Sequence, residues 1–292
     1  MHLAERGVNS KQIIGIHGLN NKPEPGILQD WWVRSIAEGI SRNSGGREVH
    51  FDFTLAYWAD LVYPEPVLLT QNPEPYLPAG DGGPLPRGVT SAGSVARTRV
   101  QEGVEKVLEK LLTAPLVENI VRDAVEAKYP DLHRYKHHPV TRRDVQERLR
   151  EPLRAAHAQG AEIMLIAHSM GSIVAYDVLR RAGRTLPGLR ISHFVTLGSP
   201  LGLGGIGEIV AGPLRVPDCV LRWSNLADPR DYAAEWNTRL SNDYRANRAG
   251  VAVSDRLVSN GYVGPSGKPN THKIYGYLRT PEMSELIAEF VR

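Results

Sequence analysis

The sequence predicts an α/β fold in which helices flank a mostly parallel sheet. Short apolar runs typical of buried strands alternate along the chain with segments whose apolar residues recur at helical spacing. Several of these runs end in polar or small-residue loops, and in a parallel sheet such loops meet at one edge. With 292 residues, 41% of them hydrophobic, the chain can bury one sizeable core, so we expect a single domain over 1–292.

The predicted elements follow one another in a regular order outside one long interruption. Strands are predicted where short apolar or alternating runs occur, and helices where apolar residues share one face over longer segments. The predicted strands are 12–16, 49–58, 163–166, 191–197 and 216–226, and the predicted helices are 27–42, 141–159, 173–179 and 282–291.

The interruption covers residues 61–138, which we expect to form a cap or lid inserted into the domain. Prolines and glycines are too dense over 63–88 for regular structure, and 96–129 reads as two amphipathic helices bent at Pro115. Packing of both helices directly on the sheet remains an equally valid interpretation. Residues 128–138 are basic and rich in histidine, but the spacing lacks a metal-binding pattern, so we expect a solvated connector.

A serine stands at a sharp junction between a predicted strand and a predicted helix. Residues 163–166 are apolar, Ser169 follows in the sequence Ala-His-Ser-Met-Gly, and an amphipathic helix begins just after it. Strand, tight turn and helix form the context in which the G-x-S-x-G motif exposes a nucleophilic serine. Gly171 fits this pattern, while Ala167 replaces the first glycine. The alternative is a serine that caps a helix after a core strand.

Other polar loops follow further predicted strands. His17 and Gly18 come directly after the first strand, as in the oxyanion loop of serine hydrolases, although an ordinary glycine turn would look the same. Asp228 lies just past the strand that ends near residue 226, and His272 stands in a late polar loop. Because these loops should open on one edge of the sheet with Ser169, we expect the four to form one site.

Composition argues against several other classes of protein. The net charge of +3 and the lack of a basic block do not suggest a nucleic-acid partner. The only cysteine, Cys219, rules out a disulfide framework and fits a reduced compartment. No apolar run has the length of a signal peptide or a membrane-spanning helix, so we expect no integral membrane segment and a cytoplasmic location.

Five segments together carry a resemblance to a known family. AHSMGS, preceded by IIGIHGLNN and followed by FVTLGSPLG, WSNLADPRD and NTHKIYGYL, resembles the α/β-hydrolase superfamily, in particular lipase and esterase branches with a His-Gly oxyanion loop. The resemblance covers the predicted sheet but not the segment from about 61 to 138. The chain begins at the His-Gly strand, so the two leading strands of fuller hydrolases are expected to be absent.

The resemblance implies a serine esterase that acts on a small ester or lipid-like substrate without a cofactor or metal. Ser169, Asp228 and His272 match the family's chain order of nucleophile, acid and base. The backbone N–H groups of Leu19 and Met170 would form the oxyanion hole.

Three alternatives stay open at this point. Asp231 could replace Asp228 as the acid, although we expect it to cap a following helix instead. A thioesterase or acyltransferase would use the same three residues, and a catalytically silent relative would only bind a partner in the groove. The sequence gives neither acyl length nor oligomeric state.

Overall fold

The computed structural model describes residues 10–79, 85–88, 130–202, 210, 212–233 and 238–292. Six described strands form one sheet in the order β2-β1-β3-β4-β5-β6, and every neighbouring pair is parallel. The prediction of an α/β fold with a mostly parallel sheet is thereby confirmed. The strands are β1 Lys11–Ile16, β2 Asp52–Ala56, β3 Glu162–His168, β4 His193–Leu197, β5 Trp223–Ala227 and β6 Val253–Leu257.

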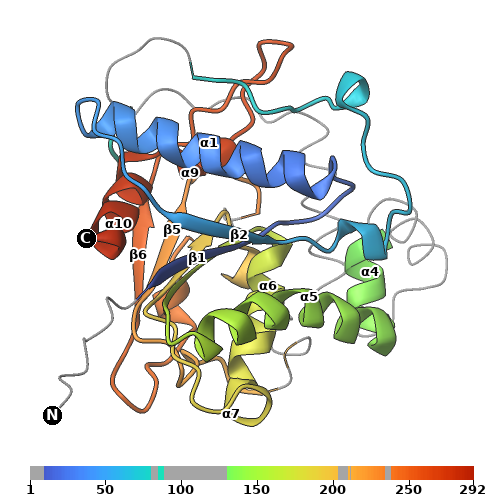
Figure 1. Cartoon of the computed structure of the whole chain (residues 1–292), viewed down its shortest axis with the longest axis vertical. Helices are drawn as coiled ribbons and strands as arrows, with labels where there is room; N and C mark the ends of the chain where they lie inside the picture. Colours follow the sequence, from blue (N-terminus) through green and yellow to red (C-terminus); the bar gives the residue numbers. More distant parts are fainter. Residues whose placement is uncertain (1–9, 80–84, 89–129, 203–209, 211, 234–237) are drawn as a thin grey trace, which may run out of the picture.

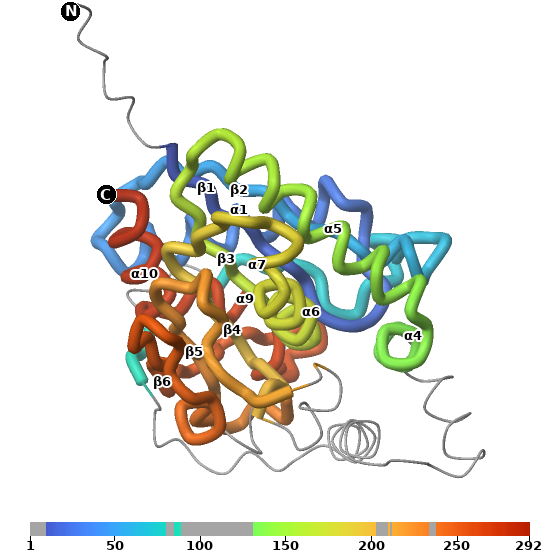
Figure 2. Tube along the Cα trace, turned by 90° about the horizontal axis from the view of Figure 1, so that it is seen from below, coloured from blue at the N-terminus to red at the C-terminus, as the bar shows by residue number. Residues whose placement is uncertain are grey.

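Helices cover both faces of this sheet (Figure 1). On one face lie α1 Pro25–Asn43, α9 Ile274–Leu278 and α10 Pro281–Val291; on the other lie α4 Pro130–His137, α5 Pro139–Ala158, α6 Met170–Arg180 and α7 Ala182–Thr185. Figure 2 shows α5 running past the β1 and β2 side of the sheet, with α6 and α7 next to it. Short 3-10 turns occur at Ala59–Leu61, Leu69–Gln71, Pro200–Gly202 and Leu240–Asn242.

The alternation of side chains along the central strands divides the core into two layers. In β1, Ile14 and Ile16 join the buried cluster under α5 and α6, whereas Ile13 joins the cluster under α1 and α10. Successive side chains of a strand point to opposite faces, so a strand buried on both faces is apolar throughout. This is why continuous apolar runs predicted the central strands.

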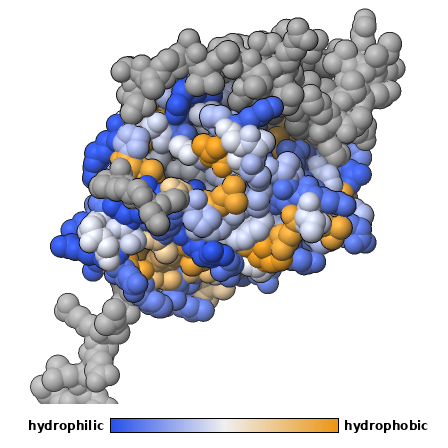
Figure 3. Space-filling model, turned by 90° about the horizontal axis from the view of Figure 1, so that it is seen from above, coloured by the Kyte–Doolittle hydropathy of each residue, from blue (hydrophilic) through white to orange (hydrophobic). Residues whose placement is uncertain are grey.

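None of the described helices is both long and apolar enough to cross a membrane. On the face drawn in Figure 3, hydrophobic residues form separate patches among hydrophilic ones.

Besides α4, three described helices or strands were not predicted, and one predicted connector is wrong. β6, α7 and α9 are short segments without a clear period. Residues 130–137, expected to be solvated, form α4 instead. Leu132 and Tyr135, three residues apart, are each 1% exposed and pack in the core, while the basic side chains of the segment obscured this face. The greater part of the expected cap over 61–138 lies outside the described residues.

The order of the strands fixes where a ligand can approach the sheet. The chain runs from β1 to β2 on one side and then crosses to β3 on the other side of β1. The loops that leave β1 and β3 therefore diverge to opposite faces, which creates a crevice at the carboxyl ends of these two strands. His17 and Gly18 follow β1 and Ser169 follows β3, so the fold places both motifs at this point.

Candidate active site

Ser169 occupies a strained turn between β3 and α6. Its backbone has φ 53° and ψ −132°, a region that side-chain-bearing residues rarely adopt and that costs of order 1–3 kcal/mol. The N–H of Ser169 donates to the carbonyl of Leu197 at the end of β4 (3.1 Å), and the N–H of Ser172 donates to the carbonyl of Ser169 (2.9 Å). These bonds hold the turn from both sides, with the Ser169 side chain facing the pocket.

The two glycines of the motifs allow the β1 loop and the serine turn to approach closely. A Cβ at Gly171 would lie 2.6 Å from the carbonyl oxygen of His17, and a Cβ at Gly18 would lie 2.6 Å from the Cβ of Ser169. Neither contact is tolerable for a larger residue. The small residues therefore serve to bring the two loops together at the crevice.

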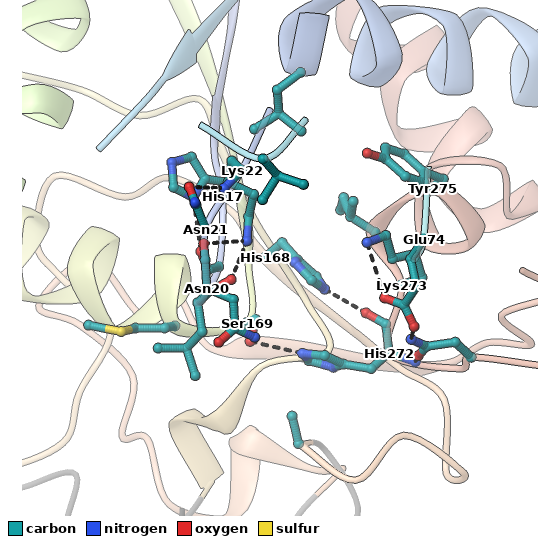
Figure 4. A pocket seen from close by; sticks show the side chains of 18 of the residues that line it. His17, Asn20, Asn21, Lys22, Glu74, His168, Ser169, His272, Lys273 and Tyr275 are labelled. Carbon is teal, nitrogen blue, oxygen red and sulfur yellow. Dashed lines mark hydrogen bonds and ion pairs between the residues drawn. The ribbon is translucent and has the colours of Figure 1, made fainter. Parts of the chain in front are cut away.

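Ser169 and His272, both predicted site residues, lie within hydrogen-bond distance in the structure. Oγ of Ser169 is 2.9 Å from Nε2 of His272 (Figure 4), and Nδ1 of His272 is 2.8 Å from Oδ1 of Asp231. The hydroxyl of Tyr277 donates to the other oxygen of Asp231 (2.6 Å). When Nδ1 carries the proton and donates it to the carboxylate of Asp231, Nε2 is left as an acceptor for the serine hydroxyl.

The carboxylate next to His272 is Asp231 and not the predicted Asp228. Asp228 and Asp231 form the ends of one tight turn, in which the N–H of Asp231 donates to the carbonyl of Asp228 (2.9 Å). The side chain of Asp228 turns to Arg230, with contacts of 2.9 Å to Nε and 2.6 Å to a terminal nitrogen, and accepts the N–H of Asn260 (2.7 Å). The prediction that Asp228 contacts His272 is wrong because the carboxylate of Asp228, which lies nearer the strand, forms an ion pair with Arg230.

The role expected for Asp231 as a cap is nevertheless visible in part. Its Oδ1 accepts the N–H of Ala233 (2.9 Å) in addition to the contact with His272. Residues 234–237, where the helix was expected to continue, lie outside the described part of the chain.

His17 orders the loop after β1 and is held neutral. Its Nδ1 donates to the carbonyl of Gly18 (2.9 Å), its Nε2 accepts the backbone N–H of Trp58 (3.0 Å), and its ring stacks on Trp58 at a centroid distance of 4.8 Å. Burial, and then the charge of Lys22, lower the pKa of His17 to about 3. Because both ring nitrogens of His17 are engaged by backbone groups, its imidazole is not free to accept a proton from Ser169.

The residues of the two predicted oxyanion donors, Leu19 and Met170, both line the pocket with Ser169. Met170 is the first residue of α6, so its N–H has no acceptor within the helix and lies at the positive end of the helix dipole. Leu19 lines the same pocket from the β1 loop.

Three residues that the sequence did not single out hold the β1 loop in place. Asn20 has a left-handed backbone, with φ 71°, and its N–H donates to the buried carboxylate of Asp131 in α4 (2.6 Å). The ammonium of Lys22 donates to the carbonyls of Leu19 and Asn20. Because these carbonyls are tied back, the loop has a fixed orientation at the pocket. The sequence could not predict this contact between Asn20 and Asp131, because 111 residues separate them in the chain.

His168, beside the serine in the sequence, supports His272 through the backbone. Its Nε2 donates to the carbonyl of His272 (2.8 Å). Burial, and then the neighbouring His272, lower its pKa well below the ordinary value of 6.5, so the ring is neutral. His168 therefore positions the loop that carries His272.

One pocket of about 230 Å³ is lined by Ser169, His272, His168, His17, Leu19 and Met170 together with their neighbours. It is smaller than the roughly 300–1,000 Å³ typical of sites for drug-sized ligands, which favours a small ligand. Lys273 and Glu74 face each other in its wall, with Nζ and Oε2 3.2 Å apart. Although burial opposes it, Lys273 lowers the pKa of Glu74 and keeps it ionised.

No group of three or more His, Cys, Asp or Glu side chains in the described ranges is arranged to hold a metal ion. A scan against protein-family models and a search of curated proteins both find no match to this chain.

Proposed function

We propose that the protein is a serine hydrolase that cleaves carboxylic esters with Ser169 as nucleophile, His272 as base and Asp231 as the orienting acid. The observation that carries the proposal is the unbroken hydrogen-bonded chain from Ser169 through His272 to Asp231, which begins at a strained residue in a pocket. Nucleophile, base and orienting group in this sequence are the general requirement for covalent acyl transfer.

The first half of the reaction transfers the acyl group to the enzyme. His272 Nε2 takes the proton of Ser169 as Oγ attacks the ester carbonyl, and Asp231 stabilises the imidazolium that forms. The N–H groups of Met170 and Leu19 are the donors for the oxyanion. Collapse of the tetrahedral intermediate breaks the bond to the alcohol, which leaves with the proton from His272.

The second half returns the enzyme to its starting state. His272 removes a proton from water, the hydroxide attacks the acyl-serine, and the C–O bond to Ser169 breaks. Oγ of Ser169 recovers the proton from His272, and the carboxylic acid is released.

The resemblance to the α/β-hydrolase superfamily is part of the same proposal. The order Ser169, Asp231, His272 along the chain keeps the family's order of nucleophile, acid and base. Among the described strands, β1 directly precedes the His-Gly step. The position of the nucleophile between β3 and α6 supports this assignment.

The test is hydrolysis of a short neutral ester such as dimethyl glutarate, followed by titration of released acid. Ser169→Ala should lower kcat/KM by roughly 10⁴-fold or more with an unchanged melting temperature. Ser254→Ala, which removes an exposed hydroxyl from β6, is the matched control and should retain full activity. Turnover by Ser169→Ala close to that of the wild type would contradict the proposal.

Covalent labelling separates an enzyme from a silent binding protein. A fluorophosphonate should react at Ser169, forming a Ser169 Oγ–phosphorus bond with loss of fluoride, and mass spectrometry should locate the adduct. Failure of the wild-type protein to label would leave a binding role as the better interpretation.

A further inference from the structure

Two lysines face the candidate site from opposite walls of the pocket. Lys22 belongs to the loop after β1, and Lys273 directly follows His272. In Figure 4 their ammonium groups lie to either side of the His168 ring, near Ser169 and His272. Glu74 is the third charged residue in the pocket lining, so the lining carries two cationic side chains and one anionic side chain.

The two ammonium groups differ in whether a carboxylate contacts them directly. Lys22 has three N–H donors and gives two of them to the carbonyls of Leu19 and Asn20. Within the described ranges, Lys22 makes no ion pair with a carboxylate. Lys273 does pair with Glu74, whose other oxygen is bonded by Asn270. Among the described residues, the carboxylates of Asp131 and Glu74 act on the charge of Lys22 without forming an ion pair with it, and one N–H of its ammonium group has no acceptor in contact.

Burial lowers the pKa of both lysine ammonium groups. Burial, and then the charge of Lys273, lower the pKa of Lys22 to about 7, and burial likewise lowers the pKa of Lys273 despite Glu74. Two ammonium groups that disfavour each other's charge are stabilised when an anion lies between them. Charge-assisted hydrogen bonds to such an anion are stronger than neutral ones.

We propose that the ester substrate carries an anionic group, a carboxylate or a phosphate, that binds between Lys22 and Lys273 while the ester carbonyl lies at Ser169. This inference rests on the proposed esterase function and specifies its substrate class. The small volume of the pocket agrees with a short substrate whose charged end and ester bond occupy the same cavity.

The test compares esters that differ in charge and little else. Monomethyl glutarate against dimethyl glutarate places a carboxylate in the acyl part, and acetylglycerol phosphate against acetylglycerol places a phosphate in the alcohol part. We expect the wild type to prefer the anionic member of at least one pair by about tenfold or more in kcat/KM, and the preferred pair identifies the group. The preference should fall as salt is raised.

Two variants of one ion pair should shift this preference in opposite directions. Lys273→Met should reduce it about tenfold, whereas Glu74→Gln, which removes the competing carboxylate, should increase it. Lys268→Met, an exposed lysine outside the pocket, is the matched control and should leave it unchanged. Lys22→Met is less informative, because Lys22 also holds the carbonyl of Leu19. A wild type with no preference for either anionic ester, or a preference that Lys273→Met does not alter, would overturn the proposal.

Binding measurements keep this inference separate from the esterase proposal. Calorimetry with Ser169→Ala protein and monomethyl glutarate or acetylglycerol phosphate should give binding that weakens about tenfold when Lys273→Met is added. Hydrolysis of neutral esters without this effect would reject only the anionic substrate. Binding with this effect but no hydrolysis of any ester would reject only the esterase.

Discussion

The turn at residues 228–231 has an aspartate at each end, and the two carboxylates have different partners. Asp228 and Asp231 are both fully buried, and only two residues separate them. Asp228 lies against the guanidinium of Arg230, which neutralises its charge within the turn. Asp231 accepts hydrogen bonds from His272, Ala233 and Tyr277. Among the described residues its one possible cationic partner is His272, when that ring is protonated.

This difference shows why position after a strand is insufficient to identify the carboxylate that contacts His272. A carboxylate that already pairs with a guanidinium has little to gain from a second cation, whereas one bonded only by neutral donors stabilises an imidazolium strongly. Pro229 favours the turn, and the turn aims Asp231 at His272. Asp228 instead fixes the loop after β6, since it accepts the N–H of Asn260, whose side chain donates to the carbonyl of Lys273 (2.8 Å).

The largest expected effect is the loss of the acid at the His272 end. Asp231→Asn should lower kcat by about 10⁴-fold, because an amide can hold the imidazole in the wrong tautomer and cannot stabilise the imidazolium. Steady-state kinetics of Asp231→Asn and Asp228→Asn, side by side, measure the comparison directly. A large catalytic loss in Asp228→Asn with a near-normal Asp231→Asn would reverse the two roles.

The next effect is one of stability at the Arg230 end. Asp228→Asn should reduce the free energy of unfolding by about 1–3 kcal/mol, because it removes a buried carboxylate that accepts hydrogen bonds from Arg230 and Asn260. Urea denaturation of the wild type and the variant provides the measurement. Unchanged stability would mean that the ion pair contributes nothing to holding the turn.

A smaller effect is expected from the hydroxyl that supports Asp231. Tyr277→Phe removes the bond to Oδ2 of Asp231 and the acceptor of the Asp228 N–H, which is 3.0 Å from the same hydroxyl. We expect kcat to fall about tenfold with KM little changed, since the carboxylate is less firmly positioned. A proportionate rise in KM alone would assign Tyr277 to substrate binding instead.

The smallest effect concerns His168, which supports the His272 end through a backbone carbonyl. Because burial holds the folded-state pKa of His168 below its unfolded value near 6.5, the stability that its neutral form contributes is complete above pH 6.5 and is lost as pH falls. His168→Gln should therefore make the free energy of unfolding less dependent on pH between 6.5 and 5. At pH 6, the loss of stability that the wild type shows relative to pH 7 and the variant does not is expected to be less than about 1 kcal/mol. Chemical denaturation at several pH values checks this, and an unaltered slope would count against it.

The sequence by itself determined the α/β class and the places where functional loops leave the strands. Apolar runs of strand length and helical spacing depend on local periodicity, which the sequence carries directly. Ser169, His17 and Gly18 were identifiable for the same reason, because a strand, a sharp turn and a helix are consecutive in the chain. The helix over 130–137 was missed because one short apolar face was masked by charged and histidine side chains.

The tertiary structure alone decided which carboxylate meets His272 and what holds the β1 loop. Asp228 and Asp231 are equivalent in sequence, and only the fold brings Arg230 to one and Tyr277 to the other. The bond between Asn20 and Asp131 likewise spans 111 residues. Such contacts depend on distances between distant segments, and these are fixed by the packing of strands and helices rather than by any local pattern.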